Sequence, residues 1–240
     1  GATMLVDGMP LKGDVMEAPV AMKVMDFWKA AAKLDLADRR KKLQGAITIE
    51  QNDRKSTARV TSQGVQGGMR LTMLFNPDDA VRRKGEDLGL DEAQMALVKE
   101  LVGETKGLVL LAAPADGGRS TLFYTVLGMH DAYTQTVQTV EMDPQLQLEG
   151  ARHQAFDPAV EGADYATLVR SMLRRDPNVL GVAEMPDAAT AKVVAAADFA
   201  RCRVYLSLRA DSAMTAIEGW TRGLGDPAMA AKNLRGVIGG

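Results

Sequence analysis

The segment from Gly107 to Thr121, GLVLLAAPADGGRST, contains the residues best suited to bind a phosphate group. An apolar run ends at a proline, continues through small residues, and leads into a hydroxyl pair, Ser120 and Thr121. This order is typical of a strand, a tight loop and a helix, in which backbone N–H groups and the helix N-terminus bind an anion. A working loop has Gly, four further residues, Gly, Lys and then Ser or Thr.

Three residues depart from that pattern. Ala113 replaces the first glycine, Arg119 replaces the lysine, and Asp116 places a carboxylate inside the loop. A planar guanidinium cannot mimic a compact ammonium group, and like charges about 4 Å apart repel by roughly 1–4 kcal/mol. The segment alone leaves two alternatives, an inactivated nucleotide loop and an ordinary strand-to-helix turn. The candidate phosphate-binding residues are Gly117, Gly118, Arg119, Ser120 and Thr121.

The elements around this loop indicate an α/β fold with a mainly parallel sheet covered on both faces, because strands alternate with helices. Expected strands are 108–112, 136–141, 179–182 and 204–208. Expected helices are 91–102, 120–129, 165–174, 188–200 and 212–222, with a last helical piece near 228–234.

The N-terminal part has a different composition. Residues 21–36 predict an amphipathic helix, and residues 46–50, 57–61 and 69–75 predict short strands. We therefore expect a small α+β domain over 1–76, a linker and helix over 77–105, and the larger domain over 106–240.

The bulk properties exclude several classes of protein. A net charge of −2 gives no reason to expect a nucleic-acid partner. No apolar run approaches the roughly 20 residues that span a bilayer. The lone Cys202 excludes an internal disulfide framework and fits a reducing compartment, so we expect a cytoplasmic protein. His130 and His153 lack metal-ligand spacing and are expected to be incidental.

Several segments together resemble the hexameric motor ATPases of type II secretion and type IV pilus assembly or retraction. The family loop GPTGSGKSTTLY is similar to APADGGRSTLFY at 113–124, and TIEDPVEYQLEG is similar to TVEMDPQLQLEG at 139–150. LRQDPDIIMVGEIRD resembles LRRDPNVLGVAEMPD at 173–187, and STLHTNDA resembles LSLRADSA at 206–213. The segments KLDLADRR at 33–40 and NLRGVI at 233–238 also have counterparts in the family.

This resemblance implies a RecA-like P-loop NTPase core behind a small PAS-like domain, with most of the family's C-terminal helical domain absent. It assigns ATP and Mg²⁺ as cofactors, Glu141 and Glu184 as candidate catalytic acids, Ser120 as the Mg²⁺ ligand, and Arg40 and Arg59 as phosphate contacts. For the two glutamates an exposed or purely structural role stays open. For the two arginines, solvation or pairing at a subunit interface is the alternative.

The departures from the family gather where chemistry would occur. Met142 and Gln145 replace acids, Arg209 replaces the histidine that senses the terminal phosphate, and Ala46 and Leu74 stand where the family has arginine. Phosphoryl transfer depends on positioning and charge compensation, so these changes together argue against turnover and against tight nucleotide binding.

The favoured hypothesis is a structural or regulatory pseudo-ATPase that acts as a homo-oligomer (a hexameric ring) or beside an authentic secretion or pilus ATPase. The resemblance also implies inner-membrane platform proteins as partners, which would place the protein at the inner membrane peripherally. The alternatives are an active Mg-dependent ATPase that tolerates Arg119, and a nucleotide-binding switch without turnover.

Overall fold

The computed structural model describes residues 1–6, 9–51, 54–75, 84–115 and 117–239. The chain divides into two compact units, Gly1–Ala80 and Val81–Gly240. Part of the expected linker, residues 77–83, lies outside the described residues. Among the helices that are described, none is long and apolar enough to cross a membrane.

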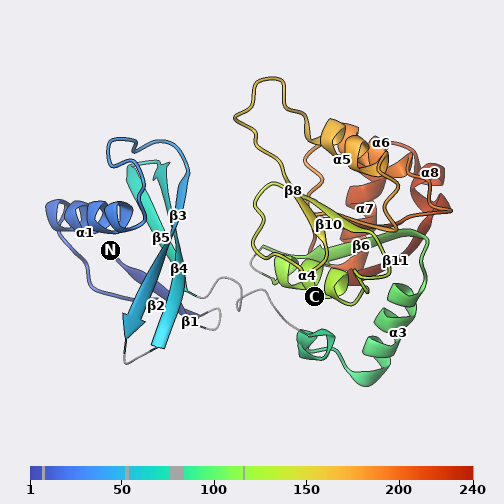
Figure 1. The fold of residues 1–240 in the computed structure, drawn as a ribbon, viewed down its shortest axis with the longest axis horizontal. Coiled ribbons are helices and arrows are strands. Elements are labelled where there is room, and N and C mark those ends of the chain that lie inside the picture. The colour runs from blue at the N-terminus through green and yellow to red at the C-terminus, as the bar shows by residue number, and fades with distance from the viewer. Residues whose placement is uncertain (7–8, 52–53, 76–83, 116, 240) are drawn as a thin grey trace. The chain divides into compact units, whose positions relative to one another are not determined.

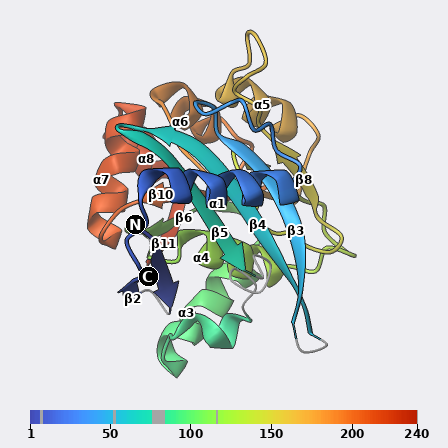
Figure 2. The same cartoon turned by 90° about the vertical axis from the view of Figure 1, so that its left-hand side faces the viewer.

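Unit 1 is built around a three-stranded antiparallel sheet in the order β3-β4-β5. Its strands are β3 (Leu43–Gln51), β4 (Arg54–Val65) and β5 (Gly68–Phe75). Helix α1 (Ala18–Ala31) lies across them (Figure 2). Trp28 and Ala32 at the end of this helix pack on Ile47, Ala58 and Val60, so the sheet has one covered face.

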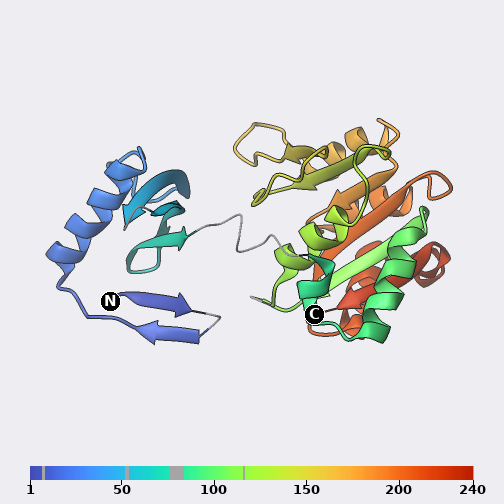
Figure 3. The same ribbon diagram turned by 60° about the horizontal axis from the view of Figure 1, so that its bottom comes forward.

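A separate hairpin precedes the helix in unit 1. It consists of β1 (Thr3–Val6) and β2 (Met9–Lys12), which pair antiparallel (Figure 3). This hairpin was not among the elements expected from the sequence. Helix α1 also begins and ends earlier than the expected 21–36. Its early start includes Pro19 in the first turn, where proline is well tolerated.

Unit 2 contains a six-stranded sheet in the order β11-β6-β10-β9-β7-β8, and every neighbouring pair is parallel. Its strands are β6 (Gly107–Ala113), β7 (Val137–Glu141), β8 (Arg152–Ala155), β9 (Val179–Val182), β10 (Arg203–Arg209) and β11 (Leu234–Gly239). The expected parallel sheet is therefore confirmed. β6 and β10 are interior strands of the sheet and are buried over most of their length, as a sheet covered on both faces requires.

Helices cover both faces of this sheet. Helices α3 (Glu92–Gly103) and α4 (Arg119–Gly128) pack on one face, with the short 3-10 helix η1 (Gly85–Leu88) beside α4. The opposite face is covered by α5 (Tyr165–Leu173), α6 (Ala188–Ala195), α7 (Ala213–Leu224) and α8 (Pro227–Lys232). Figure 1 shows α3 and α4 on the opposite side of the strands from α5 and α6.

Two elements of unit 2 differ from expectation. Helix α6 ends at Ala195 instead of continuing to residue 200, and the Asp198 carboxylate accepts a hydrogen bond from the Ala200 N–H in the turn that follows. The last helix ends at Lys232, and the next residues form β11 beside β6. Ile238 packs on the α4 face and Val237 on the opposite face, so this segment completes the sheet.

Candidate functional site

The parallel sheet places the candidate residues of unit 2 together at the carboxyl ends of its strands. Glu141 ends β7, Glu184 follows β9, Arg209 ends β10, and the loop before Arg119 follows β6. Arg209 pairs in register with Ala113, the last residue of β6. In open α/β sheets ligands bind outside the carboxyl ends of the strands, so the fold assembles these residues where a site is expected.

The loop after β6 keeps the backbone features of an anion site. Gly118 has φ +79° and precedes α4, and the Gly117 N–H donates to the Pro114 carbonyl over 3.2 Å. A Cβ on Gly117 would lie 2.6 Å from the Pro114 ring, so this turn requires glycine. No described side chain caps α4, whereas Asp or Ser side chains cap the other α-helices of unit 2. Ser120 and Thr121 lie half-buried in the first turn of α4, and Asp116 lies outside the described residues.

Arg119 occupies the position of the expected phosphate-binding cation, and its side chain has a protein partner. Its Nη1 donates to the Ala183 carbonyl over 3.0 Å, just after β9. The guanidinium therefore links the first turn of α4 to the residue that follows β9. In this conformation one of its donors is unavailable to a ligand.

Glu141 is almost fully buried, with 2% of its surface exposed. Its Oε2 accepts from the Tyr124 hydroxyl on α4. Its Oε1 accepts from Thr139 Oγ1 over 2.5 Å and lies 2.8 Å from His153 Nδ1. Both carboxylate oxygens thus have protein donors. Burial and the hydrogen bond to Glu141 raise the pKa of Tyr124, so its hydroxyl keeps its proton.

The tautomer of His153 follows from the hydrogen bond at its Nε2 atom. The Leu148 N–H donates to Nε2 over 2.9 Å, so Nε2 accepts and the ring proton is assigned to Nδ1, which faces Glu141. The Gln145 N–H similarly donates to the Tyr124 hydroxyl over 2.8 Å. The network around Glu141 therefore holds the segment after β7 against α4 and β8.

Glu184 lies beside this network in a less enclosed position. Its Oε2 accepts from the Met142 N–H over 3.2 Å and lies 3.0 Å from the Tyr165 hydroxyl. Burial raises the pKa of Glu184, and Glu141 adds to the increase, while the two hydrogen bonds and the charge of Arg119 oppose it. A half-buried acid with a raised pKa next to an arginine is the group in this region best placed to accept or release a proton.

The candidate arginines belong to unit 1. Arg59 lies on β4, directly opposite Ala46 on β3 and Leu74 on β5. Three of the four positions at which the resemblance implies arginine, 46, 59 and 74, thus form one row across the sheet, and only the central one is a cation here. Arg40 is exposed in the loop before β3, where its N–H donates to Asp38 Oδ1 over 3.0 Å.

Three members of the network around Glu141 were not predicted from the sequence, namely Tyr124, Thr139 and His153. His153 was expected to be incidental, but it contacts Glu141, the predicted acid. The available signal was its place in β8, where His153 pairs in register with Thr139, but a four-residue polar strand has no apolar alternation to reveal it. Among the described residues no group of three or more His, Cys, Asp or Glu could hold a metal ion.

Comparison with known proteins identifies the family. The family model described as "Type II/IV secretion system protein" matches residues 5–236. The chain belongs to this secretion ATPase family. It is 28% identical over 210 residues to type II secretion system protein E of Pectobacterium carotovorum, a match that covers 88% of this chain and 42% of that protein. Protein HxcR of Pseudomonas aeruginosa is 27% identical, with 88% and 45% covered.

Solved structures agree on the fold of this secretion ATPase homologue. The ATPase DotB of Legionella pneumophila superposes with a TM-score of 0.67 at 16% identity, over 94% of this chain and 63% of that one. The pilus retraction motor PilT, solved with bound ADP, gives 0.65 at 18% identity, over 99% and 70%. The RecA-like core is thus confirmed. The chain spans less than half the length of the curated relatives it matches.

Proposed function

We propose that this chain is a pseudo-ATPase of the type II secretion and type IV pilus motor family, which keeps the fold and works as a structural or regulatory subunit. The enclosure of Glu141 carries the proposal. An acid that activates water must be reachable by it, whereas Glu141 is 2% exposed and both of its oxygens are engaged, by Tyr124, Thr139 and His153.

Charge compensation supports the same conclusion. The uncapped N-terminus of α4 and the half-buried Ser120 fit a single phosphate group. The residues around them do not fit turnover of a magnesium triphosphate, because Arg119 donates to the Ala183 carbonyl and Arg209 replaces a histidine. Phosphoryl transfer needs several positioned charges at once. We therefore assign no hydrolytic step to these residues.

The proposed role is assembly. A subunit that keeps the packing of a secretion ATPase while losing its chemistry can occupy a position in a hexameric ring, either with copies of itself or beside an active homologue. Inner-membrane platform proteins are the proposed further partners, and the cytoplasm, at the inner membrane, is the proposed location. The family resemblance supports these assignments.

Calorimetric titration of Mg-ATP and Mg-ADP, with phosphate release measured on the same sample, tests the proposal. We expect no release above the buffer rate for the wild-type chain. Ser120→Ala and Glu184→Gln serve as matched variants, since each removes one group that turnover would require. Tight binding that Ser120→Ala abolishes, together with turnover that Glu184→Gln abolishes, would establish an active ATPase and refute the pseudo-enzyme.

A further inference from the structure

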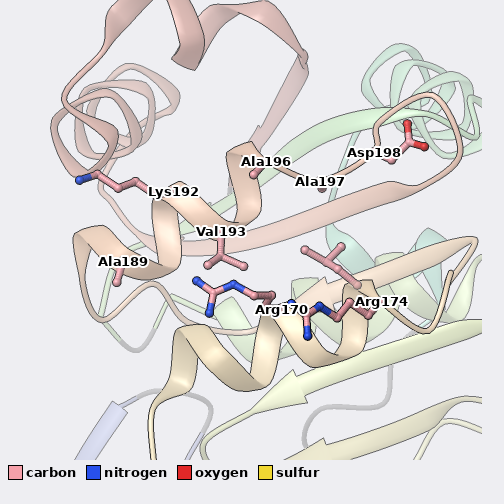
Figure 4. A pocket seen from close by; sticks show the side chains of 9 residues that line it. Arg170, Arg174, Ala189, Lys192, Val193, Ala196, Ala197 and Asp198 are labelled. Carbon is pink, nitrogen blue, oxygen red and sulfur yellow. The ribbon is translucent and has the colours of Figure 1, made fainter.

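A basic groove lies between α5 and α6, away from the sheet edge that holds Glu141 and Glu184. Its volume is about 540 Å³, within the range of protein ligand sites. Its lining includes the apolar Leu173 and Val193, which we call its floor. Arg170, Arg174 and Lys192 line it from the two helices (Figure 4). We call this feature the α5–α6 groove.

The cations of the α5–α6 groove are only partly neutralised within their own chain, where Arg170 helps to lower the pKa of Asp164. Arg170, Arg174 and Lys192 are all exposed, and in the described part of the chain none of them forms an ion pair. One carboxylate, Asp198, also lines the groove and accepts from the Ala200 N–H. Three cations and one acid leave a net charge of +2 in a chain whose total is −2. An occupant must therefore be acidic.

The same unit carries an exposed acidic segment. The residues between β8 and α5 form a loop, 157–163, which projects from the body of unit 2 (Figures 1 and 3). Asp157 and Glu161 are exposed on it, and Val160 is 58% exposed between them. Two turn hydrogen bonds shape it, from the Val160 N–H to Asp157 O and from the Ala163 N–H to Val160 O. We call this segment the acidic loop.

We propose that the α5–α6 groove binds the acidic loop of a second copy of this chain. Asp157 and Glu161 then face the three cations of the groove, and Val160 rests on the floor formed by Leu173 and Val193. The two acids match the net charge of +2, and the apolar side chain between them matches the apolar floor. Because the groove and the loop are different surfaces, the contact is head-to-tail and produces a ring or an open array.

An acidic membrane surface fits the groove less well. Polybasic lipid-binding sites use clusters of about four to eight cations on a surface that meets the bilayer. Here three cations surround a hollow with an apolar floor, which favours a projecting segment over a flat bilayer. The proposal involves neither nucleotide nor the residues around Glu141. Its failure would bear on the proposed ring of identical copies and leave the proposed loss of ATP hydrolysis untouched.

A charge-swap experiment tests the contact. The loop variant carries Asp157→Lys and Glu161→Lys, and the groove variant carries Arg170→Glu and Arg174→Glu. Each variant alone opposes like charges, so we expect self-association at least about tenfold weaker than in the wild-type chain. Mixing the two variants opposes unlike charges again and should restore association. Sedimentation velocity without nucleotide, from 5 to about 200 µM, measures each sample.

Two controls complete the design. Lys99→Glu with Lys232→Glu reverses two exposed cations on α3 and α8, outside the groove, and should associate like the wild-type chain. Circular dichroism verifies that every variant is folded. A monomeric wild-type chain over the whole range, unaltered association of the two variants, or no recovery on mixing overturns the proposal. Binding of the wild-type chain to phosphatidylserine vesicles without self-association also overturns it and assigns the groove to lipid.

Discussion

Replacing Tyr124 by Phe tests the network that encloses Glu141. Tyr124 is 3% exposed, and its hydroxyl donates to Glu141 while accepting from the Gln145 N–H. The substitution keeps the ring, which packs edge-to-face on Phe123, and removes only the oxygen. It therefore leaves a buried carboxylate with one donor fewer and a backbone N–H without its acceptor.

The expected loss of stability follows from these two contacts. A hydrogen bond to a charged group contributes about 1.5–3 kcal/mol, and a buried unsatisfied group adds a desolvation penalty, so Tyr124→Phe should cost about 2–4 kcal/mol. For a domain of this size each kcal/mol lowers Tm by about 2–4 °C. We expect a decrease in Tm of about 4–16 °C.

Thermal melts followed by circular dichroism measure this change, and the chain provides a matched control. Tyr133 also donates to a glutamate, Glu149, over 2.9 Å, but it is 83% exposed. Tyr133→Phe removes the same atom in water and should leave Tm near the wild-type value. Equal melting of the two variants would refute the reasoning, because burial of the network would then contribute nothing.

Three further predictions concern other parts of unit 2. Burial raises the pKa of Glu184 above its ordinary 4.5. The ionised form of Glu184 therefore lowers the stability of the fold at pH values above the raised pKa and has no such effect below pH 4.5. Glu184→Gln should raise Tm at pH 7–8, and this gain should disappear towards pH 4 in melts across that range. Burial raises the pKa of the Cys202 thiol to about 12, so iodoacetamide at pH 8 should label it only after unfolding, as mass spectrometry would detect. Gly181→Ala places a Cβ 2.7 Å from the Leu127 side chain and should destabilise by about 1–3 kcal/mol, whereas Gly219→Ala, which has open space within α7, should stabilise by about 0.5–1 kcal/mol in urea titrations.

The alternation of apolar strands and helices predicted most of the larger unit, because buried parallel strands and amphipathic helices have strong periodic signals. The start of the expected helix 91–102 is also correct, because Asp91 is its N-cap and the Asp91 side chain accepts from the Gln94 N–H over 2.8 Å. Strand β8 was missed because it is short, polar and at the edge of the sheet. Strand β11 was missed because Gly236 and Gly239 weaken its strand pattern, while its pairing with β6 depends on residues far away in the sequence.

The location of the candidate site could be predicted from the sequence, but the hydrogen bonds of its residues could not. The topology of parallel strands places Glu141, Glu184 and the loop before Arg119 at one edge, as the order of motifs implied. Which hydrogen bonds these groups make is a matter of tertiary geometry. The bond from Arg119 to the Ala183 carbonyl and the contact of His153 with Glu141 link residues from separate segments, and no local pattern encodes such pairs.

The position of β6 in the sheet has a consequence for how this chain acquires its structure during synthesis. The apolar strand GLVLLAA leaves the ribosome well before residues 203–209 and 234–239, which supply its two neighbours. Until both arrive, its backbone N–H and C=O groups have no ladder to join, and such unpaired apolar edges promote aggregation. The emerging polypeptide should therefore depend on a holding chaperone until β11 closes the sheet.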